Sequence, residues 1–228
     1  MNAKTEEISF AVDGGHKVSG QMLAPLQARA CYVLAHGAGA GMTHPFMQAV
    51  ATELAARNIA TLRYQFPYME QRQKRPDPPK LAQGTVRAAI AEAARLVPKL
   101  ALVAGGKSFG GRMTSQAQAA APLPGVAGLA FLGFPLHPAG QPSDQRGEHL
   151  SNVHVPMLFL QGTRDEFAEL ALLQDVVKSL SARATLRLFD DADHSFHVPA
   201  RTGKKDADVR RDMMDVLAAW IGRTVAPG

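Results

Sequence analysis

Gly106-Lys107-Ser108-Phe109-Gly110 follows an apolar run at 100–104 and opens an alanine-rich segment with helical character. A serine hydroxyl is a poor nucleophile at neutral pH, so an enzyme that uses one must expose it, place a base beside it and supply hydrogen-bond donors for the oxyanion. Glycines two positions before and two positions after the serine allow a sharp strand-to-helix turn that lifts the hydroxyl above the sheet. The pentapeptide therefore predicts that Ser108 is a nucleophile and that the backbone N–H of Phe109 contributes to an oxyanion hole.

Three other interpretations of the glycine-rich sequences compete with a nucleophile. As a simple helix cap, Ser108 would leave both flanking glycines unexplained. A phosphate-binding loop requires a glycine at position 101, which is alanine. A dinucleotide-binding loop at 37–41 would need the G-x-G-x-x-G spacing, and the next predicted strand ends in Arg63 without a ribose-binding acid. The nucleophile remains the favoured interpretation.

The rest of the chain alternates short apolar strands with amphipathic helices. Two strands at 8–12 and 18–22, joined through Asp13-Gly14-Gly15, predict an opening antiparallel hairpin. The alternation that follows predicts an α/β fold with a mainly parallel sheet and helices on both faces. The expected strands are 32–35, 59–63, 100–104, 128–132, 157–161 and 185–189, and the expected helices are 45–57, 81–97, 109–120, 166–180 and 206–221.

Length and composition indicate one domain over residues 1–228. The chain has 228 residues, of which 46% are hydrophobic, and no break in composition suggests a second domain. The first residues lack the apolar core of a secretory signal, and no apolar stretch approaches the roughly 18 residues of a membrane span. We therefore expect a cytoplasmic protein without a membrane partner. The single Cys31 lies in an apolar run and is expected to be a buried structural thiol.

The formal net charge of +5 raises the question of nucleic-acid binding. The basic residues at 72–75 lie in a proline-rich loop, and those at 204–211 are interspersed with aspartates. This mixture is typical of a solvated surface, so no nucleic-acid partner is expected.

A nucleophilic serine of this type requires an acid and then a histidine later in the chain. Asp165 closes an apolar strand and a tight turn, and His194 follows the last predicted strand. Because the carboxyl ends of parallel strands meet at one edge of the sheet, both side chains should reach Ser108. The histidine would accept the serine proton while the carboxylate fixes its tautomer. Glu166 and His197 are the alternatives for the two roles.

A second oxyanion donor is expected in the small-residue loop that follows the strand at 32–35. Ala38 is the preferred backbone N–H, with Gly39 as the alternative, because this loop can approach closely. His36 is expected to brace the loop through its own hydrogen bonds. The acidic turn at 190–193 is interpreted as solvated rather than metal-binding, so neither a metal nor another cofactor is expected.

Taken together, the nucleophile turn, the acid, the histidine and the loop at 36–37 resemble the α/β-hydrolase superfamily over nearly the whole chain. The size is similar to that of the dienelactone-hydrolase-like group, and the runs at 34–42, 64–70 and 133–138 resemble its testis-expressed-protein-like branch. The resemblance implies an α/β-hydrolase fold with a minimal lid, and hydrolase chemistry. Dienelactone hydrolases proper use a cysteine nucleophile, so the presence of Ser108 does not imply dienelactone as the substrate.

The expected function is a serine hydrolase of the carboxylesterase or thioesterase type (EC 3.1), which cleaves a small-molecule ester or thioester through an acyl-Ser108 intermediate. The alternative is a catalytically idle hydrolase fold that serves as an interaction module. The short segment between the predicted strands at 128–132 and 157–161 leaves room for a loop and a short helix only. The candidates for an apolar acyl pocket share large apolar side chains, and plain core positions are the alternative for several of them: Phe46, Phe66, Tyr68, Phe134, Leu136 and Phe167. The substrate-binding candidates are Phe66, Phe134, His137 and Arg112; for Arg112, an anion contact and a structural ion pair are both considered.

Overall fold

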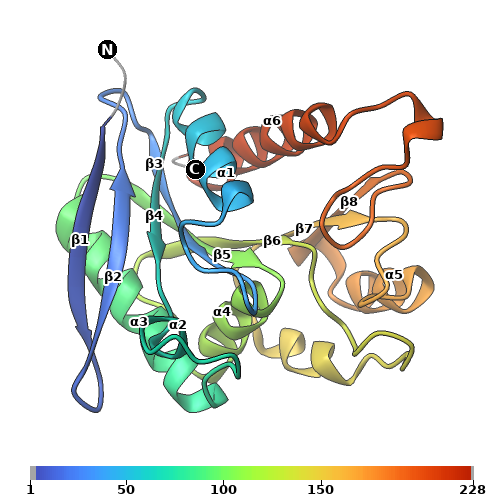
Figure 1. Ribbon diagram of the computed structural model, residues 1–228. Coiled ribbons are helices and arrows are strands. Elements are labelled where there is room, and N and C mark those ends of the chain that lie inside the picture. Colours follow the sequence, from blue (N-terminus) through green and yellow to red (C-terminus); the bar gives the residue numbers. More distant parts are fainter. Residues whose placement is uncertain (1–3, 227–228) are drawn as a thin grey trace.

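The computed structural model describes residues 4–226, and the eight strands in that part of the chain form one sheet (Figure 1). The strand order is β1-β2-β4-β3-β5-β6-β7-β8. The pairs β1–β2 and β2–β4 are antiparallel, and all later neighbours are parallel. The predicted α/β fold with an N-terminal hairpin is confirmed. The strands are β1 (Thr5–Val12), β2 (His16–Leu23), β3 (Ala30–Ala35), β4 (Ile59–Tyr64), β5 (Ala101–Lys107), β6 (Val126–Leu132), β7 (Met157–Gly162) and β8 (Ala184–Phe189).

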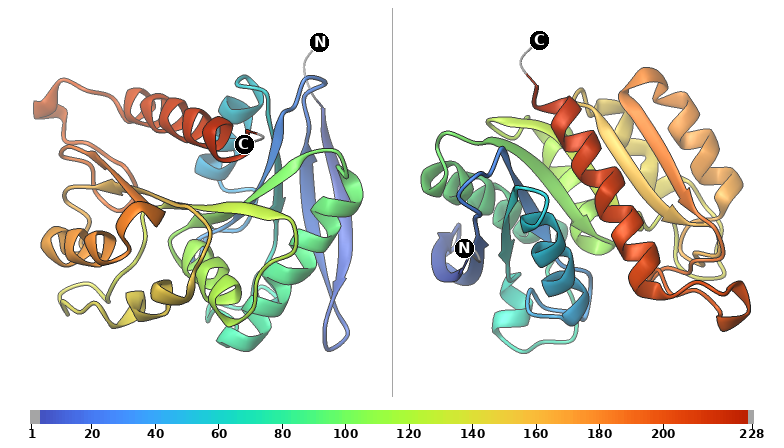
Figure 2. Two further views of the ribbon diagram at one scale, coloured as in Figure 1. Left: turned by 180° about the vertical axis from the view of Figure 1, so that it is seen from behind. Right: turned by 90° about the horizontal axis from the view of Figure 1, so that it is seen from above.

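Helices cover both faces of the sheet. Figure 2 shows α1 and α6 on one face and α3, α4 and α5 on the other. Every residue of β3, β4 and β7 is buried, as expected for parallel strands between two helical layers. The helices are α1 (Pro45–Ala55), α2 (Pro67–Glu70), α3 (Pro79–Leu96), α4 (Phe109–Ala120), α5 (Leu170–Ser179) and α6 (Asp206–Thr224), and the 3-10 helices are η1 (Gln145–Asn152), η2 (Ser181–Arg183) and η3 (Ala200–Thr202).

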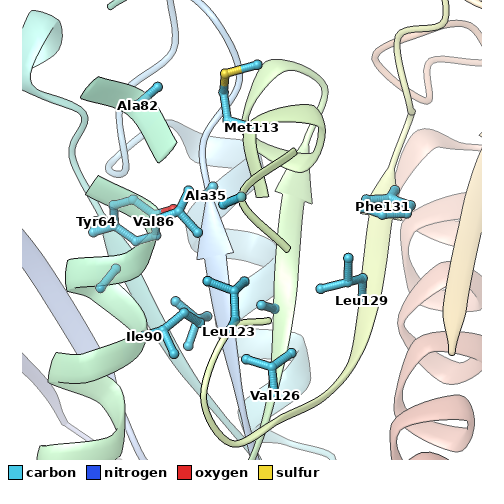
Figure 3. Close-up of a cluster of buried hydrophobic side chains, with 14 of the residues drawn as sticks. Ala35, Tyr64, Ala82, Val86, Ile90, Met113, Leu123, Val126, Leu129 and Phe131 are labelled. Carbon is cyan, nitrogen blue, oxygen red and sulfur yellow. The ribbon is translucent and has the colours of Figure 1, made fainter. Parts of the chain in front are cut away.

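The core consists of two apolar clusters, one on each face of the sheet. Alternate residues of β3 divide between them, since Val33 belongs to the cluster under α3 and α4, whereas Leu34 belongs to the cluster under α1 and α6. Figure 3 shows part of the first cluster, where Val86 and Ile90 of α3 lie near Tyr64 of β4. Each large aliphatic side chain buried in this way contributes roughly 1.5–3 kcal/mol. The two clusters make the sheet a rigid support for the loops at its carboxyl edge.

Several element boundaries differ from the sequence-based expectation, and two of these differences bear on the site. Strand β5 continues to Lys107, so it reaches the residue before Ser108. Helix α5 begins at Leu170 rather than 166, because the segment before it forms a turn closed by hydrogen bonds to Asp165. Propensity alone does not show such a turn, since its stabilising contacts come from a side chain at its start.

The connection between β6 and β7 contains the short helix η1, which packs against α4. Within residues 4–226, none of the helices has both the length and the apolar character that crossing a bilayer demands.

Candidate active site

Ser108 occupies a strained turn between β5 and α4. Its φ of 49° and ψ of −118° lie in a region that residues with side chains rarely adopt. A Cβ atom at Gly106 would lie 2.2 Å from the carbonyl oxygen of Ala35, and a Cβ atom at Gly110 would lie 2.5 Å from that of His36. Both motif glycines are therefore required because β3 approaches the turn too closely for any side chain.

The structure brings Ser108, His194 and Asp165 into one hydrogen-bonded line. His194 Nε2 lies 2.8 Å from Ser108 Oγ, and His194 Nδ1 lies 2.7 Å from Asp165 Oδ2. The Asp165 side chain is fully buried, whereas 17% of the His194 side chain is exposed. With Nδ1 donating to the carboxylate, Nε2 is the acceptor for the serine proton. The three residues come from the ends of β5, β7 and β8, as the parallel topology predicts.

The Asp165 carboxylate is held by two further donors. Gln161 Nε2 donates to Oδ2 at 2.6 Å, and the Phe167 backbone N–H donates to Oδ1 at 2.8 Å. Gln161 in turn accepts a 2.8 Å hydrogen bond from the backbone N–H of Phe134. Our sequence analysis missed Gln161. Its signal was a polar residue at the end of an apolar strand, four positions before the acid.

The two alternative residues lie away from this line. Glu166 is exposed to solvent. His197 Nδ1 pairs with Asp206 Oδ2 at 2.9 Å on the surface, and this hydrogen bond raises the pKa of His197. Of the residues considered for each role, the geometry selects Asp165 and His194.

Two backbone N–H groups near Ser108 are the candidates for an oxyanion hole. Phe109 is the first residue of α4, so its N–H has no partner within the helix. Ala38 lines the cavity in front of Ser108. The alternative donor, Gly39, gives its N–H to the hydroxyl of Tyr68 at 3.2 Å. Ala38 and Phe109 are therefore the better pair.

His36 fixes the loop that carries Ala38. Its Nδ1 donates to the Gly37 carbonyl at 2.8 Å, and its Nε2 accepts from the Phe66 backbone N–H at 3.1 Å. Burial lowers the pKa of His36 to about 4, so the ring is neutral at physiological pH. This arrangement agrees with the bracing role expected from the sequence.

A cavity of about 360 Å³ opens in front of Ser108. Of the six acyl-pocket candidates, Phe46 and Phe167 form aromatic walls, and the Phe167 ring lies 4.6 Å from that of His194. The other four are buried core residues instead: Phe66, Tyr68, Phe134 and Leu136. Lys107, His44, Met47 and Ser195 also line the cavity and were not anticipated. These residues reach the cavity only because loops that are distant in the sequence fold together, and a short sequence motif does not show such an arrangement.

The four predicted substrate-binding residues are placed elsewhere, which corrects that expectation. None of them is among the residues that line the cavity within the described part of the chain, 4–226. Phe66 and Phe134 are fully buried core residues. His137 is buried as well, with Nε2 accepting from the Glu169 backbone N–H at 2.7 Å, so it supports the turn before α5. Burial lowers the pKa of Arg112, and the like charge of Arg146 lowers it further, so the charged group that acts on Arg112 is not an ion-pair carboxylate.

Between residues 4 and 226, the structure contains no group of three or more His, Cys, Asp or Glu side chains arranged to hold a metal ion. Cys31 is fully buried in β3, and burial raises the pKa of its thiol to about 12. A thiol in this state is a structural core residue, as expected.

Comparison with known proteins finds a matching family model and solved structures with a similar fold. A family model described as "Alpha/beta hydrolase domain" matches residues 28–222. A dienelactone hydrolase from Anabaena variabilis has 20% identity and a TM-score of 0.77, with 98% of this chain and 99% of that chain covered. A serine hydrolase without lid from Xanthomonas campestris has 20% identity and a TM-score of 0.74, with 96% of each chain covered. At these identities the structural likeness shows the shared fold.

Proposed function

The chain belongs to the alpha/beta hydrolase domain family, and we propose that it is a serine hydrolase that cleaves small carboxylic esters or thioesters through an acyl-Ser108 intermediate. The observation that carries the proposal is the continuous line from Ser108 Oγ through His194 to the buried carboxylate of Asp165. The three side chains leave different strand ends, and a neutral imidazole between a hydroxyl and a carboxylate is the arrangement that activates serine. The oxyanion donors at Ala38 and Phe109 complete it.

Acylation begins when Ser108 Oγ attacks the substrate carbonyl carbon. The serine proton passes to His194 Nε2, and the carbonyl oxygen becomes an oxyanion that accepts hydrogen bonds from Ala38 and Phe109. Asp165 stabilises the imidazolium that forms. The bond from the carbonyl carbon to the leaving oxygen or sulfur then breaks, and His194 gives its proton to that atom. The alcohol or thiol departs and the acyl group remains on Ser108.

Deacylation repeats the sequence with water. His194 Nε2 takes a proton from the water while the water oxygen attacks the acyl carbon, and the same two N–H groups hold the second oxyanion. The ester bond to Ser108 breaks, and Oγ regains a proton from His194. The carboxylic acid leaves, and the enzyme returns to its starting state without any external cofactor being consumed.

The cavity supports the assignment of small substrates. Its volume of about 360 Å³ is at the lower end of the usual range for ligand sites. Phe46, Met47 and Phe167 supply an apolar wall suited to an uncharged acyl or alcohol group. We propose that short, uncharged acyl groups are preferred over long fatty acyl chains.

A panel of p-nitrophenyl esters and acyl thioesters tests this function. The wild type should hydrolyse the short-chain members. Ser108→Ala should lose at least about 10³-fold in kcat. Ser179→Ala, which alters an exposed serine in α5, serves as the matched control and should retain the wild-type rate. A folded wild-type protein that hydrolyses no member of the panel would contradict the proposal.

A further inference from the structure

Lys107, the residue directly before the nucleophile, reaches across to the loop that carries the base. Its Nζ donates to the backbone carbonyl of His194 at 2.6 Å, which links the end of β5 to the segment after β8. The link joins residues 87 positions apart in the sequence. The side chain therefore contacts the main chain from which the imidazole of His194 projects.

The Lys107 ammonium packs between the ring of Phe196 and the backbone at Gly133. It is placed over the ring of Phe196, 5.6 Å from the ring centroid, where a cation is attracted to the aromatic face. A Cβ atom at Gly133 would lie only 3.0 Å from Nζ, so the absence of a side chain at that position leaves room for the ammonium. The stem is confined as well, because a Cβ atom at Gly37 would be 3.4 Å from Lys107 Cγ.

The charges that face this ammonium belong to the same site. Asp165, from the turn after β7, and Asp193, from the loop after β8, are the two acids that act on Lys107. Burial nevertheless lowers its pKa from 10.5 to about 8. Removing an ammonium from water is costly, and a single carbonyl partner compensates for only part of that cost. A lysine on the surface would avoid this desolvation cost. We therefore expect the buried ammonium to have a role at this position.

We propose that Lys107 is a positioning residue for His194, whose carbonyl it holds so that the imidazole stays aligned between Ser108 and Asp165. The inference rests on the proposed function and deepens it. His194 must exchange a proton at Nε2 while Nδ1 remains on the carboxylate, and a small rotation of its loop would break one of the two hydrogen bonds.

Lys107→Met tests the role, because methionine fills a similar volume without the charge or the donor. Lys107→Arg keeps both, and Lys178→Met, on the exposed end of α5, is the matched control. The first measurement is the rate of covalent labelling at Ser108 by a fluorophosphonate probe as a function of pH. The second is the downfield proton resonance of the His194 Nδ1–H that is hydrogen-bonded to Asp165, which requires no turnover.

We expect Lys107→Met to slow labelling by about 10- to 100-fold and to broaden or remove the downfield resonance. Lys107→Arg should recover part of both effects, and Lys178→Met should match the wild type. A lysine that only stabilises the fold would leave the resonance unchanged. If Lys107→Met does not fold, Lys107→Gln, which is also neutral, is measured in the same way.

The two proposals fail separately. Labelling of the wild type, together with an unchanged labelling rate and an unchanged resonance in Lys107→Met, would overturn the role of Lys107 and leave the hydrolase proposal intact. An unlabelled wild type whose downfield resonance still depends on Lys107 would overturn the hydrolase and support the positioning of His194.

Discussion

Gln161 directs its side-chain amide at Asp165: Nε2 lies 2.6 Å from Oδ2, the same oxygen that faces His194 at 2.7 Å. Because the Gln161 carbonyl oxygen accepts from the Phe134 backbone N–H, the amide cannot rotate away without losing two hydrogen bonds. The carboxylate that orients His194 is thus itself oriented by a buried residue of β7. Support of this kind from outside the reacting groups is a general requirement of preorganised sites.

The first prediction concerns this amide. Gln161→Leu removes the donor to Asp165 and leaves the buried N–H of Phe134 without its partner. We expect the free energy of unfolding to fall by about 1–3 kcal/mol and kcat to fall about 10-fold or more. Urea unfolding and ester hydrolysis check the two effects. Gln174→Leu, on the exposed face of α5, should change neither by a comparable amount, and equal effects in both variants would refute the assignment.

The second prediction concerns His36 and the acid side of the stability profile. Its pKa is lowered from 6.5 to about 4, so the unfolded chain binds the proton at a higher pH than the folded protein does. The neutral His36 side chain makes its full contribution to the free energy of unfolding above about pH 6.5, and this contribution is lost as the pH falls toward 4. At about 1.36 kcal/mol per pKa unit, the loss is roughly 3 kcal/mol. The difference in urea-unfolding free energy between the wild type and His36→Gln should therefore shrink from pH 7 to pH 4.

An exposed histidine provides the comparison for His36. His154→Gln should leave the pH dependence of stability as it is in the wild type. A wild type and a His36→Gln variant with parallel stability profiles between pH 4 and pH 7 would show that burial of His36 carries no such penalty.

The third prediction concerns Lys107 and the stability of the protein above pH 7. Its pKa is lowered from 10.5 to about 8, so between these values the unfolded chain holds more protons than the folded protein. The free energy of unfolding should therefore rise with pH across this window, which makes the charged form a cost at pH 7. Lys107→Met should lack this rise, whereas Lys178→Met should keep it. Urea unfolding at pH 7 and pH 9.5 provides the measurement, and a rise of equal size in Lys107→Met would contradict the burial of the ammonium.

The fourth prediction concerns the width of the cavity. Phe46→Ala removes an aromatic wall in front of Ser108 and should shift the preference toward longer acyl chains. Because one methylene in an apolar pocket changes selectivity by roughly 10-fold or more, the ratio of kcat/KM for a hexanoyl ester over an acetyl ester should rise at least several-fold. Leu26→Ala changes a side chain that is 88% exposed and should not alter the ratio. An unchanged ratio in Phe46→Ala would remove Phe46 from the acyl site.

The fold and the meeting of Ser108, His194 and Asp165 could be predicted because their signals are local. Alternating apolar and helical segments predict a parallel sheet, and the topology then places Ser108, Asp165 and His194 at one edge. The spacing of Gly106 and Gly110 around Ser108 predicts the turn that the structure shows. Each of these inferences uses residues that are close together in the sequence or at the ends of consecutive elements.

The supporting and substrate-facing residues could not be predicted in the same way. Phe66 and Phe134 follow strand ends, as the reacting residues do, yet their rings turn into the core, because packing decides the direction of a side chain. Gln161 and Lys107 act through partners 4 and 87 positions away, and their contacts depend on the final arrangement of the loops. Such contacts leave little trace in a single sequence beyond a polar residue in an apolar strand.

The central claim is that Ser108 is a nucleophile activated by His194 and Asp165. Its most direct test is intact-mass analysis of the folded protein after treatment with a fluorophosphonate probe, followed by peptide mapping. The account predicts one probe per wild-type chain, located on Ser108, with no label on Ser108→Ala and slow labelling of His194→Ala. Absence of label on the folded wild type, or a label that persists in Ser108→Ala, would contradict it.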